Sequence, residues 1–372
     1  MKKLLIGNAA VARGAYEAGC SVVSSYPGTP STEITESMVE YTDVNVEWAP
    51  NEKVAAEVSI GASMAGARAM SCMKHVGLNV MADPLFTVSY IGVNGGLVFC
   101  VADDPGMHSS QNEQDSRHYA KASKVLMLEP SDSKECKDYT KKAFELSEKF
   151  DSPVILRLST RVSHSQSLVE IEDKIDYKLK DYNKDIAKNV MMPGNAIKKH
   201  VIVEKRHLDE IAYANESDLN VVENNNKKIG VITAGISYVY SKEALGDNVD
   251  YLKLGIVNPL PTTKIIDFCK KHDKVFVIEE LDPFIEEHVR ALGVTNVVGK
   301  EVFTLLGEYT PKMIKKAVLN IEGPEFNEIK ETIPMRPPVM CPGCPHRGTF
   351  YVLKKLGLVE STDWSGATAP NV

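Results

Sequence analysis

The sequence lacks the features that would place the protein outside the cell, in a membrane or on nucleic acid. Its seven cysteines are scattered, and the odd count favours reduced thiols over a disulfide framework. No stretch approaches the ~20 consecutive apolar residues that a membrane span requires. The net charge of −7, with both signs interleaved, disfavours a polyanionic partner. We therefore expect a soluble cytoplasmic protein that binds neither nucleic acid nor membrane.

Several common catalytic and nucleotide-binding motifs are also missing. No GxGxxG follows a predicted strand and no GxxxxGKS/T is present, so neither a Rossmann nor a P-loop nucleotide site is predicted. HExxH and GxSxG are absent too. What remains is ordinary globular composition, 43% hydrophobic and 25% charged, over 372 residues. This length predicts two or three domains.

Short apolar runs alternate with helical patterns over residues 1–165. The expected helices cover 9–18, from Ser31 or Thr32 to Val39, and from Asn51 onward. The expected extended segments are 21–25, 44–49, 70–73, 96–102, 125–128 and 153–158. This alternation is typical of a parallel sheet covered on both faces. The predicted fold class is therefore α/β, with a doubly wound first domain.

The rest of the chain divides into a connection, a second α/β unit and a polar C-terminal part. Residues 166–227 are interpreted as a long, partly exposed connection with an extended piece and a helix. Residues 228–300 predict a smaller doubly wound domain with three strands and three helices. Residues 301–338 are interpreted as helix and polar linker.

The loop of residues 26–31, YPGTPS, lies between a predicted strand and a predicted helix, where open α/β sheets bind ligands. Backbone N–H groups at the start of a helix favour an anion or a carbonyl oxygen. A rigid turn with a serine cap explains the same residues equally well.

Two further stretches carry candidate functional residues. Glu52 opens a helix rich in alanine, serine and glycine, which lets another backbone or a flat ligand approach closely. A lone glutamate in a first turn is, however, usually a surface residue that complements the helix dipole. The polar loop 102–117 is longer than the roughly two to six residues of ordinary βα loops. It is either functional, with His108 as a proton carrier, or an exposed connection.

The segment CPGCPHRG clusters Cys341, Cys344 and His346. A zinc site is disfavoured, because structural zinc normally has two separated ligand pairs and this segment offers three ligands at cramped spacing. A redox pair is disfavoured by Pro342 and Pro345 and by the absence of a thioredoxin-like context.

Five motifs in order carry a resemblance to a known family. They are YPGTPSTE, NEKVAAEVSIGASMAGARAM, KHVGLNVMADPL, DDPGMHSSQNEQDSR and CPGCPHRG. From residue 1 to about 358 the chain resembles the alpha subunits of indolepyruvate:ferredoxin oxidoreductases, in the thiamine-diphosphate-dependent 2-oxoacid:ferredoxin oxidoreductase superfamily. The resemblance implies oxidative decarboxylation of an aryl 2-oxoacid with coenzyme A, giving an acyl-CoA and reduced ferredoxin.

The resemblance also implies roles for domains and residues. Residues 1–165 would be the pyrimidine-binding domain, 228–300 a transketolase C-terminal-like domain, and 339–358 the start of a diphosphate-binding domain. Glu52 would hydrogen-bond N1′ of the cofactor's aminopyrimidine and so activate it, which reverses the surface interpretation. Pro27, Gly28 and Thr29 would bind cofactor, with Thr29 near the substrate carbonyl. Candidate pocket residues are His108, Gln111 and Asn112.

Two departures from the family pattern shape these expectations. Pyruvate-cleaving relatives have an arginine after the apolar strand, whereas Asp103 and Asp104 stand here, which favours a larger substrate. The Mg²⁺-binding segment and the cysteine-rich modules for [4Fe-4S] clusters do not follow 339–358. We therefore expect no metal ligands, a truncated chain with a non-native tail over 359–372, and weak cofactor binding.

The binding partners expected for this protein are implied by the family resemblance alone. It implies a beta subunit, ferredoxin, coenzyme A, a 2-oxoacid substrate and a homo-oligomer. The alternative hypotheses are a catalytically silent assembly or regulatory protein on the same domains and, less favoured, a zinc-binding module at CPGCPH.

Overall fold

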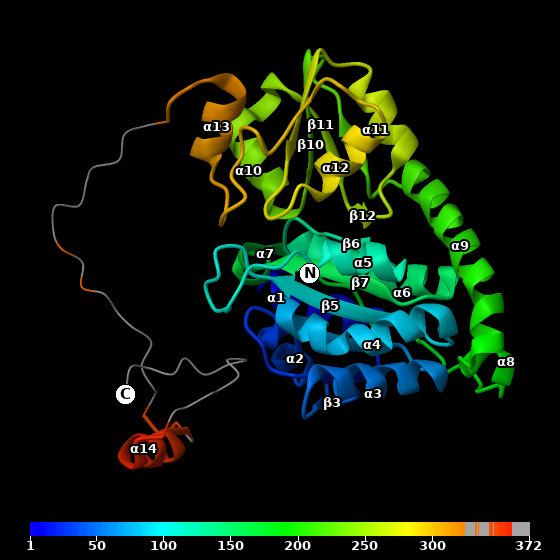
Figure 1. The fold of residues 1–372 in the computed structure, drawn as a ribbon. Helices are drawn as coiled ribbons and strands as arrows, with labels where there is room; N and C mark the ends of the chain where they lie inside the picture. The colour runs from blue at the N-terminus through cyan, green and yellow to red at the C-terminus, as the bar shows by residue number, and fades with distance from the viewer. Residues whose placement is uncertain (324–331, 333, 335–341, 345, 359–372) are drawn as a thin grey trace. The chain divides into compact units, whose positions relative to one another are not determined.

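The computed structural model describes residues 1–323, 332, 334, 342–344 and 346–358 (Figure 1). It divides into two units, Met1–Glu322 and Gly323–Val372. The second unit holds the described helix α14 (His346–Leu356), within the predicted start of a diphosphate-binding domain. The predicted tail 359–372 and most of the predicted linker beyond residue 323 lie outside the described residues. The elements below belong to the first unit.

A seven-stranded sheet forms the larger α/β part, in the order β12-β6-β7-β5-β4-β2-β3. Its strands are β2 (Val22–Ser25), β3 (Asn45–Trp48), β4 (Ala69–Lys74), β5 (Leu97–Asp103), β6 (Leu126–Leu128), β7 (Val154–Ser159) and β12 (Ile256–Asn258). Neighbours run parallel, except that β12 pairs antiparallel with β6. Every residue of β4, β5 and β7 is buried, as expected for strands covered on both faces.

Helices cover both faces of this sheet. One hydrophobic cluster contains residues of α1 (Gly7–Glu17), α2 (Thr32–Met38) and α6 (Ser133–Phe150). A second cluster contains residues of α3 (Glu52–Met64), α4 (His75–Ile91) and α5 (Arg117–Ser123). The doubly wound α/β fold predicted from the sequence is confirmed.

A five-stranded sheet forms the smaller α/β part, in the order β14-β13-β10-β11-β9. Four strands run parallel: β10 (Ile229–Ala234), β11 (Asp250–Leu254), β13 (Lys274–Ile278) and β14 (Val297–Val298). The edge strand β9 (Val221–Glu223) pairs antiparallel with β11. Its helices are α10 (Gly235–Leu245), α11 (Thr262–Cys269), α12 (Phe284–Ala291) and α13 (Pro311–Leu319), with the 3-10 turn η1 (Gly246–Asn248). The second hydrophobic cluster extends into this sheet, so the two parts share a core.

The predicted connection contains more regular structure than the sequence indicated. After α7 (Thr160–His164), β8 (Gln166–Glu170) pairs antiparallel with β1 (Lys2–Ile6) in a separate two-stranded sheet. Then come α8 (Ile186–Asn189) and the long helix α9 (Pro193–Glu216). In Figure 1, α9 runs along one side of both large sheets. Within α9, Val203, Arg206, Glu210 and Ala214 are buried, whereas Ile197, Val201 and Leu208 on the other side are exposed.

Two boundaries differ from the sequence-based prediction. β12 comes from the segment assigned to the second domain, yet it pairs with the first sheet at Met127 and Leu128. The linker predicted to begin at residue 301 begins later, because Phe303, Tyr309 and Ile314 pack into the core of the second sheet. Both differences arise from contacts between residues far apart in the sequence.

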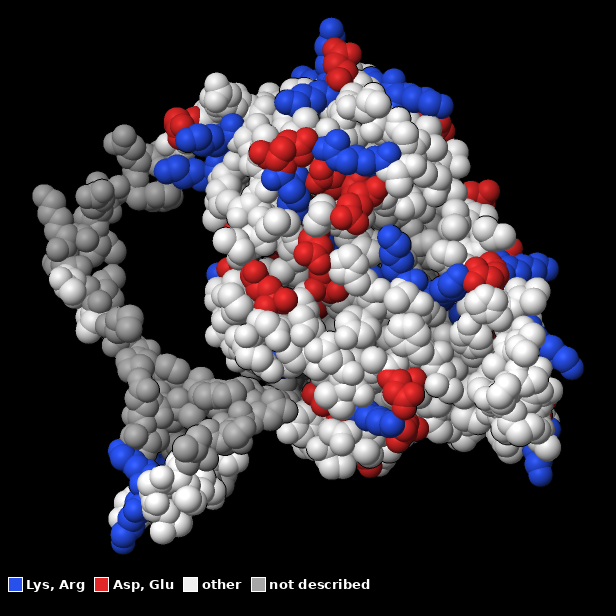
Figure 2. Space-filling view, in the orientation of Figure 1, with Lys and Arg blue, Asp and Glu red and all other residues white. Residues whose placement is uncertain are grey.

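The surface of the first unit carries charges of both signs. On the face shown in Figure 2, acidic and basic side chains are interspersed. Among the helices of the described residues, none combines the length and the apolar character that crossing a membrane requires.

Candidate active site

Four segments meet at the carboxyl ends of neighbouring strands of the seven-stranded sheet. They are the loop after β2, the start of α3 after β3, the junction of β4 with α4, and the loop after β5. Since these strands are parallel and adjacent, in the order β5-β4-β2-β3, their carboxyl ends lie along one edge. This edge is where open α/β sheets bind their ligands.

The loop after β2 is held by its own hydrogen bonds. The N–H of Gly28 donates to Thr32 Oγ1 at 2.9 Å, and Ser31 Oγ donates to the carbonyl of Gly28 at 2.9 Å. Ser31 takes the N-cap position of α2, as predicted, but its side chain turns back to Gly28 and makes no capping bond to the helix. Pro27 and Thr29 are exposed, so the ordered loop presents them outward.

Glu52 is buried at the first position of α3. Asn51 caps the helix by accepting a hydrogen bond from the Val54 N–H at 2.9 Å, so Glu52 is not needed as a cap. Only 7% of Glu52 is exposed, and among the described residues no side chain and no other residue's backbone donates to its carboxylate. Burial raises the pKa of this carboxyl, against the opposing effect of its own backbone N–H and of Lys74.

Gly77 lets α4 pass directly over the Glu52 carboxylate. A Cβ added to Gly77 would lie 2.4 Å from Glu52 Oε1, so any side chain there would displace the carboxylate. The sequence pattern alone favoured a surface glutamate, but Glu52 is a buried carboxylate with unused acceptor capacity. Such a group suits a ligand that brings hydrogen-bond donors.

Lys74 and His75, at the junction of β4 and α4, are also buried. Lys74 Nζ donates to the Ser109 carbonyl at 2.6 Å, and His75 Nε2 lies 3.1 Å from the Asn112 carbonyl. Burial lowers the pKa of the Lys74 ammonium, while Asp104 and Glu52 act in the opposite direction. Sequence reasoning did not single out either residue, although both belong to the motif KHVGLNVMADPL and Lys74 directly follows an apolar run.

Asp104 shapes the loop after β5. Its carboxylate accepts hydrogen bonds from Ser109 N at 2.8 Å, Ser110 Oγ at 2.7 Å and Thr160 Oγ1 at 2.7 Å. Burial alone would raise the pKa of Asp104, but these hydrogen bonds hold it below its ordinary value. The loop is therefore folded back on the end of β4, and it is not simply an exposed connection.

The three predicted pocket residues of this loop lie in different surroundings. His108 Nε2 lies 3.0 Å from Glu308 Oε2, beside an open cavity of about 410 Å³ that Arg161 and Tyr240 also line. Gln111 and Asn112 are exposed, and Asn112 meets the end of β4 through its backbone carbonyl. The structure thus brings Asn112, but not the His108 side chain, into contact with His75.

A buried ion network joins the far end of this loop to the second sheet. Arg117 binds Asp115 through Nε at 2.8 Å and Glu279 through Nη1 at 2.5 Å. Arg157 binds Asp103 Oδ2 through Nε at 2.8 Å and Glu129 Oε1 through Nη1 at 2.6 Å. Sequence reasoning missed this network, because Arg117 and Glu279 are 162 positions apart.

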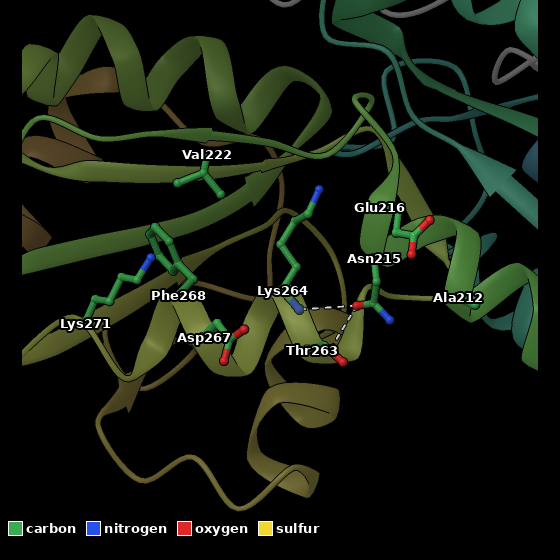
Figure 3. A pocket seen from close by; sticks show the side chains of 9 residues that line it. All are labelled: Ala212, Asn215, Glu216, Val222, Thr263, Lys264, Asp267, Phe268 and Lys271. Carbon is green, nitrogen blue, oxygen red and sulfur yellow. Dashed lines mark hydrogen bonds between the residues drawn. The ribbon is translucent and has the colours of Figure 1, made fainter.

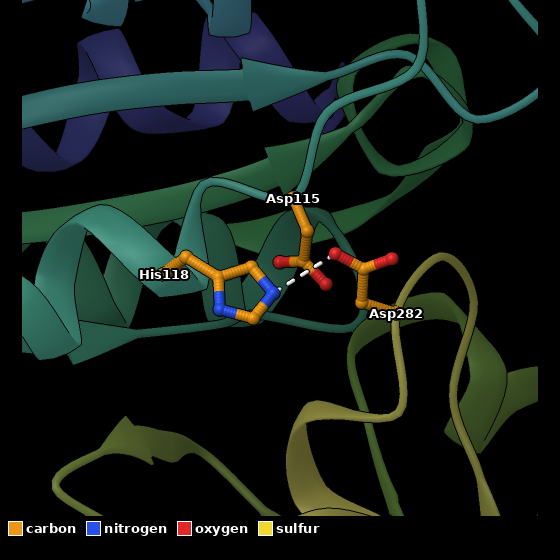
Figure 4. Close-up of side chains that lie close together, drawn as sticks. All are labelled: Asp115, His118 and Asp282. Atoms are coloured by element: carbon orange, nitrogen blue, oxygen red, sulfur yellow. Dashed lines mark hydrogen bonds and ion pairs between the residues drawn. The ribbon is translucent and has the colours of Figure 1, made fainter.

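Among the described residues, one cluster of potential metal ligands was found, formed by Asp115, His118 and Asp282 (Figure 4). His118 Nε2 pairs with Asp282 Oδ2 at 2.9 Å, but both oxygens of Asp115 accept from Arg117 Nε. Because Arg117 already neutralises Asp115, this cluster does not fit Mg²⁺. Of the CPGCPH residues, Cys344 is a free thiol, while Cys341 lies outside the described residues.

A cavity of about 540 Å³ lies on the smaller α/β part (Figure 3). Asn215 of α9 and Lys264 and Phe268 of α11 help to line it. Asn215 Oδ1 accepts the N–H groups of Thr263 and Lys264, so the amino end of α11 is already capped. None of the residues predicted from the sequence to form a site lines this cavity.

Comparison with known proteins identifies relatives over most of the chain. It is 43% identical to the indolepyruvate oxidoreductase subunit IorA of Archaeoglobus fulgidus, over 95% of this chain and 61% of that protein. It is 41% identical to the subunit of the same name from Pyrococcus horikoshii, over 95% of this chain and 59% of that protein. The chain thus spans about 60% of the length of these relatives.

Solved structures show the same fold at low sequence identity. A 2-oxoglutarate:ferredoxin oxidoreductase from Magnetococcus marinus matches with a TM-score of 0.74 at 19% identity, over 86% of this chain and 65% of that chain. A split-gene transketolase matches with a TM-score of 0.53 at 14% identity, over 84% of this chain and 95% of that chain. The profile of the family described as pyruvate flavodoxin/ferredoxin oxidoreductase, thiamine diphosphate-binding, matches residues 13–230. The chain therefore belongs to this family of thiamine-diphosphate-binding oxidoreductase domains.

Proposed function

We propose that this chain supplies the aminopyrimidine-binding side of an enzyme that oxidatively decarboxylates aryl 2-oxoacids, indolepyruvate first among them. The products would be an acyl-CoA, carbon dioxide and reduced ferredoxin. The family membership and the names of the relatives at 43% and 41% identity support this proposal. The single observation that carries it is the buried carboxylate of Glu52.

Thiamine diphosphate would supply an acidic carbon for nucleophilic chemistry at a 2-oxoacid and a sink for the electron pair released by decarboxylation. Glu52 would accept a hydrogen bond from N1′ of the aminopyrimidine. Its site fits this role, because the carboxylate is 7% exposed, no other described residue donates to it, and Gly77 leaves room for it. A raised pKa suits a carboxyl that shares a proton with a ring nitrogen.

The loop after β2 would complete the cofactor site. Pro27 and Thr29 are exposed on a loop whose conformation is fixed by the hydrogen bonds of Gly28. We assign Pro27, Gly28 and Thr29 to cofactor binding, and Thr29 also to the substrate carbonyl. His108, Gln111 and Asn112 remain proposed pocket residues, with Asn112 best placed through its contact with His75.

The proposed reaction also involves other components. The relatives' name, oxidoreductase subunit, indicates that further subunits are needed. A beta subunit, ferredoxin and coenzyme A are therefore part of the proposal. Mg²⁺ for the diphosphate and [4Fe-4S] clusters for electron transfer enter it through the resemblance alone.

The test is the Glu52→Gln variant in the assembled oxidoreductase. This change keeps the size of the side chain but removes the carboxylate, so indolepyruvate-dependent reduction of ferredoxin should fall by about 10²–10⁴-fold. The matched control is Glu57→Gln, on the same helix and exposed, which should retain wild-type activity. Activity of Glu52→Gln within about threefold of wild type, with the protein folded, would contradict the proposal. If the chain were a catalytically silent assembly protein, neither the wild-type protein nor Glu52→Gln would show activity.

A further inference from the structure

Three lysines of the described residues are buried, and Lys74 differs from the other two. Lys137 Nζ lies 3.3 Å from Glu17 Oε2 and 3.2 Å from Glu172 Oε1, and Lys253 is ion-paired with Glu135. Lys74 is only 6% exposed, yet no carboxylate of the described residues lies within ion-pair distance of its Nζ. Its hydrogen-bond partner there is one backbone carbonyl, that of Ser109.

A buried ammonium with a single neutral partner is unfavourable in the free protein. A charged group removed from water is normally paired with an opposite charge, because desolvation otherwise costs several kcal/mol. An ammonium has three donors, and Lys74 uses one of them on Ser109. Since no described carboxylate lies within ion-pair distance, the remaining donors of Lys74 are free to meet an external anion.

Building on the proposed function, we infer that the Lys74 ammonium binds the carboxylate of the 2-oxoacid substrate. The location supports this assignment. The Lys74 side-chain carbons lie 3.1 Å from the position that a Cβ on Gly28 would take, so the stem runs along the loop proposed to bind cofactor and substrate. Glu52 and Asp104 both act electrostatically on the ammonium, which places the cation within the field of the proposed catalytic carboxylate.

Two arginines around the loop after β5 are already neutralised. Arg157 is ion-paired with Asp103 and Glu129, and Arg161 is ion-paired with Glu308. The neighbouring strand β5 ends in Asp103, which is acidic and cannot hold a carboxylate. Among the lysine and arginine side chains of the described residues named here, Lys74, at the end of β4, is the one without a carboxylate partner.

The test measures binding and does not depend on turnover. Phenylpyruvate is titrated calorimetrically into the cofactor-free chain, for wild type, Lys74→Met, Lys74→Arg and the control Lys53→Met. The Lys53 side chain is 44% exposed and paired with Asp83, so Lys53→Met removes a positive charge next to Glu52 in the sequence without changing the buried Lys74 site. We expect affinity to fall about tenfold or more for Lys74→Met, as for the loss of a charge-assisted hydrogen bond. Lys74→Arg should retain part of the affinity, and Lys53→Met should match wild type.

Two further titrations separate this inference from its alternatives. Phenylacetone, which lacks the carboxylate, should bind wild type and Lys74→Met equally. Thiamine diphosphate with Mg²⁺ should also bind both equally; a tenfold loss in Lys74→Met would assign Lys74 to the cofactor's diphosphate and overturn the inference. Equal phenylpyruvate affinity in wild type and folded Lys74→Met, or no saturable binding to wild type, would overturn it as well. The proposed function is tested by a separate experiment. It would be contradicted if Glu52→Gln had wild-type activity in the assembled enzyme.

Discussion

At the scale of single residues, the candidate site consists of charged groups that the fold buries without pairing. Glu52 has no donor from another described residue and Lys74 has no acidic partner, although both are more than nine-tenths buried. The sequence predicted Glu52 only through the family resemblance, because a glutamate in a first helical turn has the same local pattern whether it is exposed or buried. Lys74 was missed because its burial depends on loops that come from other parts of the chain.

Because Lys74 has no acidic partner among the described residues, we expect its replacement by methionine not to destabilise the fold. In Lys74→Met the hydrogen bond to Ser109, worth about 1 kcal/mol, is lost, but an unpaired buried charge is also removed. We expect the free energy of unfolding, measured in urea without ligand, to stay the same or to rise. Lys253→Met provides the comparison, because it leaves Glu135 without its buried partner and should lower the free energy of unfolding by about 1–3 kcal/mol. A larger loss for Lys74→Met than for Lys253→Met would assign Lys74 a structural role.

The raised pKa of Glu280 predicts that the stability of the fold depends on pH. Burial raises its pKa to about 7, against the opposing hydrogen bond from the Tyr309 N–H. A raised folded-state pKa means that this group stabilises the fold fully below its unfolded pKa of about 4.3, and that this contribution is lost as the pH rises through about 7.

Urea unfolding at pH 5 and at pH 8 tests this for wild type and Glu280→Gln. The glutamine keeps an acceptor for Tyr309 but does not titrate. Wild type should lose stability relative to the variant as the pH rises, by an amount on the order of 2 kcal/mol. Parallel pH profiles for the two proteins would show that Glu280 does not titrate in this range.

At the scale of elements, the loop after β5 is positioned from both ends. Asp104 binds its first part through Ser109 and Ser110, and Arg117 joins its end to Glu279 at the carboxyl side of β13. The sequence showed only a long polar stretch, for which an exposed loop and a functional loop were equally open. The buried ion network shows that the end of the loop is fixed in place, but this network depends on partners in the second α/β part and has no local signature.

The network predicts that Arg117 is a main link between the loop and the second sheet. Arg117→Met leaves the buried carboxylate of Glu279 without an ion-pair partner and Asp115 with only the longer contact to Arg157 at 3.8 Å, so the free energy of unfolding should fall by about 3–5 kcal/mol. Arg161→Met is the control, because it removes an exposed ion pair with Glu308 and should cost no more than about 1 kcal/mol. Chemical denaturation of both variants measures the difference, and similar losses would show that the buried network contributes no more than a surface pair.

At the scale of the whole molecule, local patterns predicted the layered α/β fold and placed its strands closely. The four runs expected at 70–73, 96–102, 125–128 and 153–158 correspond to β4, β5, β6 and β7, with each end shifted by at most one residue. Long-range pairing was not predicted. β12 joins the first sheet and β1 pairs with β8, and both partnerships depend on tertiary packing that no periodicity within a segment encodes.

The central claim is that Glu52 activates thiamine diphosphate from this edge of the sheet. Its most direct measurement is the exchange rate of the cofactor's C2 proton in D₂O, followed by rapid quench and proton NMR on the assembled enzyme. We expect exchange in Glu52→Gln to be at least about a hundredfold slower than in wild type, and exchange in Glu57→Gln to proceed at the wild-type rate. Equal exchange rates in wild type and in Glu52→Gln with bound cofactor would contradict the claim.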